Sequence, residues 1–387
     1  MNKFAISALF CGALFLLPSC GGSNDEPTPD DPKQEVESKD LDFTTANSKG
    51  WLNYSVNVAQ LLVNDAKSLN DSWNTSYNGG VAYKEIFRNH NNSNFGSALS
   101  CIEQILDGCS DIANEVGEAK IGDPYQLYVS GRREEALYAV ESWYSWHSRD
   151  DYSNNILSIR NSYFGALTNS ASSNSMASLV AAQNADLDTR TRSAITAAYD
   201  AIQSIPQPFR NNINSSEAVK AMDACEALRK LIDSELKPFF QGLGDEFDGK
   251  LHEIVVNYVD NVVIPTYSQL QTRNQALLDA VKALQSNPSN SNFNKACDAW
   301  LNAREPWEKS EAFLFGPVDA LGLDPNMDSW PLDQDAIVKH LQSGSFDDLN
   351  WTDGDSDDKV EAVQSIRGFH TLEFLLFKDG QPRTAAN

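Results

Sequence analysis

The segment Ile-Arg-Gly-Phe-His-Thr-Leu-Glu-Phe-Leu-Leu-Phe (Ile366–Phe377) decides the fold, because a helix of this sequence is apolar in nearly every direction. A helix that is apolar all round is buried in a core. His370 and Glu373 are three residues apart, so they project from the same face of that helix. A buried carboxylate is costly unless it is paired or binds a metal. The segment therefore predicts a helical core that contains either a structural His–Glu pair or a metal site.

Helical periodicity dominates the chain from about Thr44 onward, and nothing in it resembles a run of alternating strands. We predict an all-α protein of two helical bundles of the four-helix type, residues 42–240 and 245–387, packed side by side. The boundary is placed where glycines interrupt the helical pattern near residue 242. Pro265 and Pro306 should bend or break two of the helices. The expected helices cover residues 51–69, 97–116, 152–167, 188–204, 215–236, 250–284, 294–315, 335–341 and 358–377.

The first 19 residues predict a signal peptide, because a basic start at Lys3 is followed by an apolar stretch too short to span a bilayer. The sequence Leu-Pro-Ser-Cys ending at Cys20 resembles a bacterial lipoprotein cleavage site, so Cys20 would carry the lipid. An ordinary cleaved signal is the alternative. Residues 20–41 are rich in Gly, Pro, Asp and Glu and predict a flexible tether. We expect an outer-membrane lipoprotein, periplasmic or cell-surface, that meets the membrane only through its lipid anchor.

The chain has 387 residues and a formal net charge of −24 at pH 7. This charge argues against nucleic acid or an anionic membrane surface as a partner, and it is compatible with a protein that handles cations. The remaining cysteines of the mature chain show no Cys-x-x-Cys metal spacing, so we expect buried thiols. These cysteines are Cys101, Cys109, Cys225 and Cys297.

Three segments carry a resemblance to a known family. Gly368–Glu373 resembles the Gly-x-His-x-x-Glu signature of imelysin-like proteins, and 302–333 is similar to the segment before that signature. Glu141–Ser145 resembles the Glu-Ser segment of the family's other half. The family consists of bacterial envelope proteins, many implicated in iron uptake, and some carry a peptidase label. In most members the half with the signature comes first, so this chain resembles a circularly permuted member in which residues 242–249 join the usual ends.

The residue pattern and the resemblance together place a candidate site between the two bundles. Glu305, Glu308 and Glu311 form a stripe that would ordinarily be solvated, but Glu311 precedes an apolar run and is the one expected to point inward. Arg304 could bind an anion or the carboxylate of a chelate. The candidate ligands for iron or zinc are His370, Glu373 and Glu311. The candidate pocket residues are Gly368, Arg304, Glu305, Trp307, Trp330, Glu141 and Ser142.

We predict that the protein binds a metal ion or metal chelate in iron acquisition, without catalysis, and works with an outer-membrane transporter. A zinc peptidase is the first alternative, because His-x-x-Glu with a remote third ligand also occurs in zinc hydrolases. The chain lacks His-Glu-x-x-His, and no second histidine stands out as a zinc ligand. A scaffold or adhesin with a structural His–Glu pair is the second alternative. No residue in the sequence separates that role from metal binding.

Overall fold

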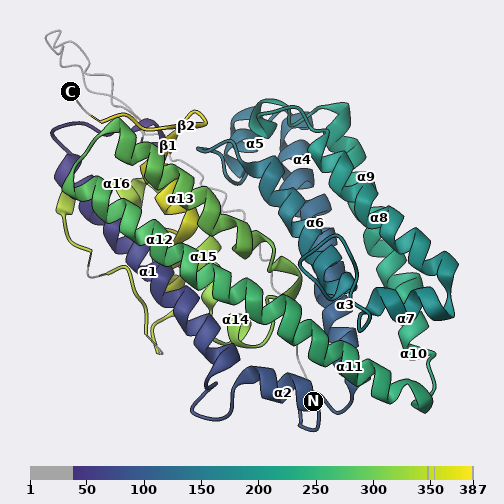
Figure 1. Cartoon of the computed structure of the whole chain (residues 1–387). Helices are drawn as coiled ribbons and strands as arrows, with labels where there is room; N and C mark the ends of the chain where they lie inside the picture. The colour runs from purple at the N-terminus through teal and green to yellow at the C-terminus, as the bar shows by residue number, and fades with distance from the viewer. Residues whose placement is uncertain (1–37, 347, 353, 386–387) are drawn as a thin grey trace, which may run out of the picture. The chain divides into compact units, whose positions relative to one another are not determined.

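The computed structural model describes residues 38–346, 348–352 and 354–385 (Figure 1), and helices dominate them. The predicted all-α class is confirmed. The described residues from Ser38 onward belong to one compact unit. Among them, no helix has both the length and the apolar character needed to cross a bilayer. The predicted signal peptide, the lipidated Cys20 and nearly all of the predicted tether lie outside the described residues.

The helices alternate with short turns along the chain. The first part contains α1 (Ser48–Asn74), α2 (Tyr83–Asn89), α3 (Ala98–Asn114), α4 (Asp123–Val129), α5 (Arg133–Ala139), α6 (Ser148–Phe164), α7 (Met176–Gln183), α8 (Ala185–Gln203), α9 (Ser216–Leu231) and α10 (Lys237–Gln241). The second part contains α11 (Asp248–Tyr258), α12 (Ile264–Ser286), α13 (Asn290–Glu308), α14 (Pro317–Ala320), α15 (Leu323–Asp328), α16 (Gln334–Ser343), α17 (Asp357–Gln364), α18 (Gly368–Leu376), β1 (Phe377–Lys378) and β2 (Gln381–Pro382).

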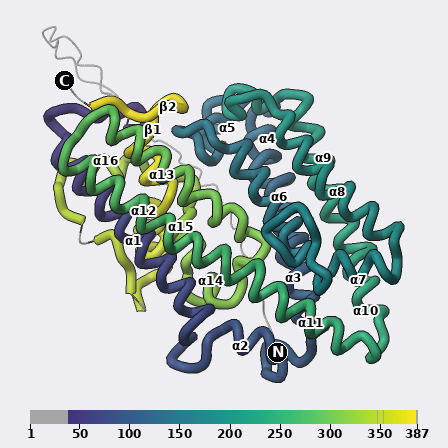
Figure 2. Tube along the Cα trace, in the orientation of Figure 1, coloured from purple at the N-terminus to yellow at the C-terminus, as the bar shows by residue number. Residues whose placement is uncertain are grey.

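The long helices pack in two sets. Helices α3, α6, α8 and α9 contact one another, while α1, α12, α13 and α18 form the second set. Helix α1 falls within the expected 42–240 bundle by sequence, yet it runs beside α12 (Figure 2). Trp51 Nε1 donates to Leu375 O at 2.8 Å and Tyr54 Oη donates to Ile366 O at 2.6 Å. An amphipathic pattern shows which face of α1 is buried but does not show which helix covers it.

Prolines shape three of the helices without stopping them. The π-helical segments Glu115–Gly122, Ile232–Leu236 and Val259–Val263 each end two residues before a proline: Pro124, Pro238 and Pro265. A proline has no N–H and crowds the carbonyl four residues earlier, and a π-helical turn relieves that conflict. The bend expected at Pro265 therefore takes the form of a widened turn.

Pro306 lies inside α13, which ends two residues later at Glu308 instead of running to residue 315 as predicted. The proline cannot donate to the carbonyl of Asn302, four residues before it. Arg273 supplies that missing donor, because its Nη1 lies 2.9 Å from Asn302 O. After α13 the chain turns through a 3₁₀ turn (Glu311–Phe313), and this turn brings Glu311 into the interior.

The two described ends of the chain meet. Lys378 Nζ lies 2.8 Å from both carboxylate oxygens of Asp42, and Arg383 Nη1 donates to Leu41 O at 3.1 Å. Only a short turn, Gly242–Gly244 and Asp245–Phe247, connects α10 with α11. The contact between the ends that a permutation requires is confirmed, whereas the permutation itself stays a prediction.

The single helix predicted for residues 358–377 is in fact α17 followed by α18. Gly368 begins α18 with φ +84°, a conformation that disfavours residues with a Cβ. A Cβ at this position would lie 2.5 Å from Met327 O, so only glycine lets the α15 backbone approach. Beyond α18, Asp379-Gly380 with positive φ at both residues joins β1 to β2. An Asp-Gly pair is a sequence signal for a hairpin, and this one lies just beyond the helix predicted to end at residue 377.

Candidate functional site: a buried ionic network between the helix sets

His370 and Glu373 lie on α18, where every side chain is buried. His370 Nδ1 lies 3.0 Å from Glu373 Oε2. Glu373 Oε1 accepts the backbone N–H groups of Tyr144 at 3.0 Å and Ser145 at 2.7 Å. The helix therefore contacts the 141–145 segment, as the resemblance implies, but through backbone donors and not through the side chains of Glu141 or Ser142.

The other edge of His370 faces charged groups. Its Nε2 lies 3.2 Å from Asp328 Oδ1 and 3.3 Å from Arg304 Nη2, and Trp330 packs against the imidazole with ring centroids 4.9 Å apart. Burial and the Arg304 charge lower the pKa of His370, but hydrogen bonds to Asp328 and Glu373 outweigh both and raise it to about 9. The imidazole is therefore a cation at neutral pH, held between two carboxylates.

Arg304 on α13 is the centre of the network and is fully buried. Its guanidinium pairs with Asp328, with Glu308 Oε1 at 2.7 Å and with Asp151 Oδ2 at 3.6 Å. Asn155 Nδ2 donates to the other Glu308 oxygen at 2.6 Å. A buried guanidinium requires several anionic partners to offset its desolvation. Arg304 is thus already neutralised by the chain's own carboxylates and has little capacity for an external anion.

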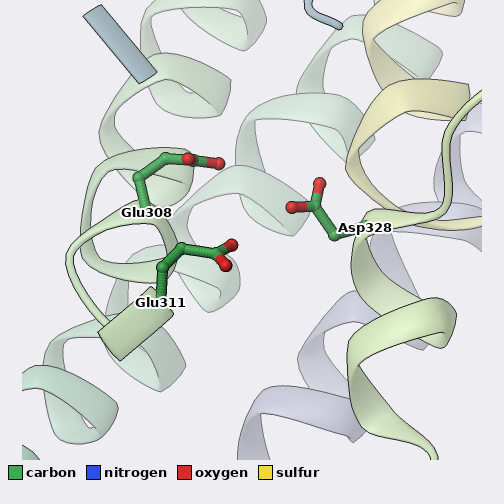
Figure 3. A group of neighbouring side chains, drawn as sticks. All are labelled: Glu308, Glu311 and Asp328. Carbon is green, nitrogen blue, oxygen red and sulfur yellow. The ribbon is translucent and has the colours of Figure 1, made fainter. Parts of the chain in front are cut away.

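Three carboxylates come together beside this cation. Glu308, Glu311 and Asp328 each offer an oxygen within 4.8 Å of the others, and Figure 3 shows Asp328 opposite the two glutamates. Trp307 Nε1 donates to Asp328 Oδ2 at 2.7 Å, which fixes that carboxylate. Glu311 is only 8% exposed, and its carboxylate accepts no hydrogen bond from the described residues. We call Glu308, Glu311 and Asp328 the acidic cluster. Among the described residues it is the group of three or more His, Cys, Asp or Glu side chains whose spacing suits a metal ion.

The pKa values of three acidic side chains, Glu308, Glu311 and Asp324, indicate a local shortage of positive charge. Burial raises the pKa of Glu311 well above its usual range, although Lys120 opposes it. Burial and the neighbouring carboxylates raise the pKa of Glu308 to about 8 and that of Asp324 to about 7, against the opposing effects of Arg304 and Lys120. Carboxylates with pKa values this high would take up either protons or a cation at neutral pH.

Lys120 supplies a further buried cation near the acidic cluster. It lies on the π-helical segment Glu115–Gly122 and pairs with Glu141 at 2.9 Å and Glu115 at 3.4 Å. Glu141, predicted to line a pocket with His370, is instead the partner of Lys120. A π-helical turn interrupts the usual α-helical hydrogen bonding and often occurs at functional sites.

Ser142 is buried beside Asp151. Its backbone has φ +50°, and its hydroxyl donates to Asp151 Oδ2. The other Asp151 oxygen lies 2.8 Å from His147 Nδ1. Asp151 therefore separates the serine from the histidine, which is not the arrangement that lets a histidine activate a serine. Ser142 and His147 orient Asp151 toward Arg304.

Glu305 differs from the other candidates because its side chain is 38% exposed and pairs with Lys309 and Arg273. Glu308 lies one turn after Arg304 on the buried face of α13, and the end of that helix brings Glu311 inside, whereas Glu305 stays outside. Sequence reasoning missed Asp328, Asp151 and Lys120 as members of the network. Asp328 lies at the end of α15, where no helical stripe marks it as buried. Trp307 and Trp330 do line the network, and Gly368 permits the backbone approach that brings Asp328 near His370.

The family model described as Imelysin (Peptidase_M75) matches residues 26–235 and 263–387. The chain belongs to the imelysin family. The crystal structure of an imelysin peptidase from Bacteroides ovatus is 56% identical, with a TM-score of 0.89, and the match covers 90% of this chain and all of that one. The two chains therefore share the fold described above, and more than half of their aligned residues are identical.

Two more distant relatives carry an iron-related name. The iron-regulated protein A of Synechococcus elongatus is 31% identical over 131 residues, which are 34% of this imelysin and 33% of that protein. This chain thus spans about a third of the length of that relative. A putative iron-regulated protein A precursor from Parabacteroides distasonis is 35% identical over 44% of this chain and 51% of its own, with a TM-score of 0.41. That TM-score is too low for a structural argument.

Proposed function

We propose that this imelysin is a non-enzymatic cell-envelope protein that binds a metal ion or metal chelate in iron acquisition. One observation carries the proposal: Glu308, Glu311 and Asp328 converge within 4.8 Å in the protein interior, and the Glu311 carboxylate has no hydrogen-bond donor among the described residues. Carboxylate oxygens are the ligands preferred by hard cations, and carboxylates on facing helices hold iron in the di-iron bundle proteins. The charge of the group also fits a bound metal: despite Arg304 and Lys120, the pKa values of Glu308 and Glu311 are raised. The pKa of Asp328 is lowered, because Arg304 and His370 outweigh the effect of burial.

The proposal changes the role of the His-x-x-Glu motif. His370 and Glu373 were expected to be ligands, but both imidazole nitrogens already lie within 3.2 Å of carboxylate oxygens. In the proposed site they position Asp328, and Asp328 with the two glutamates would hold the cation. Such outer residues orient the ligands and tune their affinity. Glu311, also an expected ligand, keeps that role.

The peptidase alternative needs a different arrangement. A catalytic zinc site uses a neutral imidazole nitrogen and leaves one coordination position open for water. The pKa of His370 is about 9, and its Nε2 faces Asp328 and Arg304. The peptidase name belongs to the Bacteroides ovatus neighbour. In this chain the contacts of His370 favour binding over catalysis. The scaffold alternative predicts that metal leaves the protein unaffected.

The envelope setting is the remaining part of the proposal. Lipidation of Cys20 would hold the protein at the outer membrane, on its periplasmic or surface side, near a transporter that imports the metal. The iron-regulated name of the Synechococcus relative supports an iron-linked role. We also propose that the family halves are circularly permuted, which the contact between Asp42 and Lys378 supports.

The test is metal-dependent melting of the mature protein with ferrous, ferric and zinc ions, at about pH 7.5 and about pH 5.5. A ligand at a hundredfold excess over its dissociation constant stabilises the native state by about 2.7 kcal/mol. We expect a rise in melting temperature at the higher pH and a smaller one at the lower pH, because protons compete for carboxylates with raised pKa values.

The matched variants are Glu311→Gln and Glu305→Gln. The first replaces a carboxyl group inside the acidic cluster, and the second replaces one outside it. Glu311→Gln should abolish the metal-dependent rise, and Glu305→Gln should keep it. Equal shifts in both variants would remove the acidic cluster from the proposal. No shift with any ion would favour the scaffold, and casein cleavage that is lost in His370→Ala would favour the peptidase.

A further inference from the structure

Two histidines from distant parts of the chain touch on the surface, away from the acidic cluster. His90 Nε2 lies 3.0 Å from His252 Nδ1, and the two rings are 5.2 Å apart at an interplanar angle of 71°. In the sequence no second histidine stood out as a metal ligand. These histidines are 162 positions apart in the sequence, so only the fold brings their imidazole nitrogens together.

The chain holds the two rings with other contacts. His90 ends α2 in a left-handed conformation, φ +34°, and its N–H bonds Ile86 O, while His252 lies on α11. Arg88 of α2 also pairs with Asp260, beyond the end of α11. Phe87 of α2 packs against Tyr258 of α11 with ring centroids 6.4 Å apart. Helices α2 and α11 therefore remain packed without the histidine pair, and the pair can be changed without dismantling the fold (Figure 1).

The spacing of the nitrogens suits a metal ion. Two nitrogens bound to one zinc at about 2.0–2.1 Å in a tetrahedral site lie roughly 3.3 Å apart, close to the separation of His90 Nε2 and His252 Nδ1. Asp248 stands one helical turn before His252 on α11, but among the described residues its carboxylate does not share ligand spacing with both imidazoles, so water would supply the remaining ligands. Imidazole suits borderline divalent ions such as zinc, nickel and copper.

We propose that His90 Nε2 and His252 Nδ1 form a second metal site, which takes a borderline divalent transition ion with water as its remaining ligands. It differs from the acidic cluster, whose ligands are all oxygens and suit harder cations. The site is partly open to solvent, so exchange with free ions would be rapid.

The competing explanation is a simple hydrogen bond between one imidazole N–H and the other ring nitrogen. Titration of the untagged mature protein with zinc and with copper separates the two, because a polyhistidine tag would itself bind these ions. The titration is done in a Glu311→Gln background, so that binding at the acidic cluster does not contribute. In this way failure of the second site and failure of the proposed function give separate results.

The variants are His90→Gln and His252→Gln, with His340→Gln on α16 as the surface-histidine control. We expect one equivalent of copper whose electron paramagnetic resonance spectrum shows two coupled nitrogens. Either single variant should show one coupled nitrogen and a dissociation constant raised at least about tenfold, because one arm of a chelate is lost. His340→Gln should behave as the parent. Copper or zinc binding that is unchanged in the double variant, or absent in the parent, would overturn the proposal and leave a hydrogen bond.

Discussion

Replacing Gly368 with alanine is the sharpest test of how the motif's glycine builds the site. The new Cβ would lie 2.5 Å from Met327 O and 2.8 Å from Met327 C, distances at which backbone atoms must move. The residue would also retain φ +84°, which costs an alanine about 1–2 kcal/mol. Forcing extra volume into a packed site costs about 1–3 kcal/mol more. We therefore expect Gly368→Ala to lower the free energy of unfolding by about 2–5 kcal/mol.

Gly131→Ala is the matched control, because Gly131 has φ +91° with no atom within 4 Å of the added Cβ. It should cost only the backbone part, about 1–2 kcal/mol. Urea denaturation gives both values, with equal m-values as evidence that the unfolding reaction is the same. Because Met327 precedes Asp328, the clash should also weaken metal binding in Gly368→Ala but not in Gly131→Ala. Equal destabilisation by the two substitutions would refute the argument that Met327 O requires glycine here.

Three further predictions concern the buried network. Glu373→Gln should lower the free energy of unfolding by about 3–5 kcal/mol, because it leaves the His370 cation with one fewer anion. In the same urea assay the exposed Glu305→Gln should change the free energy of unfolding by less than about 0.5 kcal/mol. Similar values for the two variants would refute the assigned burial. Trp307→Phe keeps an aromatic ring but removes the indole N–H donated to Asp328 Oδ2. It should lower the free energy of unfolding, measured by urea denaturation, by about 1–3 kcal/mol. A neutral result would contradict that hydrogen bond. Burial lowers the pKa of His147, but the charge and hydrogen bond of Asp151 outweigh it and raise the pKa to about 9. Since this folded pKa lies above the unfolded value near ~6.5, the contribution of His147 is complete below about pH 6.5 and is lost as the pH rises through 9. The stability difference between the parent and His147→Gln should therefore shrink by about 1–3 kcal/mol over that range, and a constant difference would exclude the His147–Asp151 ion pair.

The sequence by itself determined the helical class and the burial of the motif helix. The segment Gly368–Leu376 is apolar all round, and such a helix can be stable in water only inside a core. The spacing of His370 and Glu373 likewise fixed their contact, because local helical geometry places them on one face. The family resemblance of Glu141–Ser145 correctly pointed to the segment that meets Glu373, although the contact uses backbone N–H groups that no side-chain pattern can reveal.

Only the tertiary structure decided which carboxylates share a site. Asp328 and Asp151 come from α15 and α6, far from Arg304 in sequence, and nothing local to either residue marks it as a partner of that guanidinium. The inward position of Glu311 depended on where α13 ends, shortly after Pro306, and on the 3₁₀ turn that follows. The pKa values of the acids depend on burial and on charges brought together by packing, because electrostatic energy depends on distance in space and not on separation along the chain.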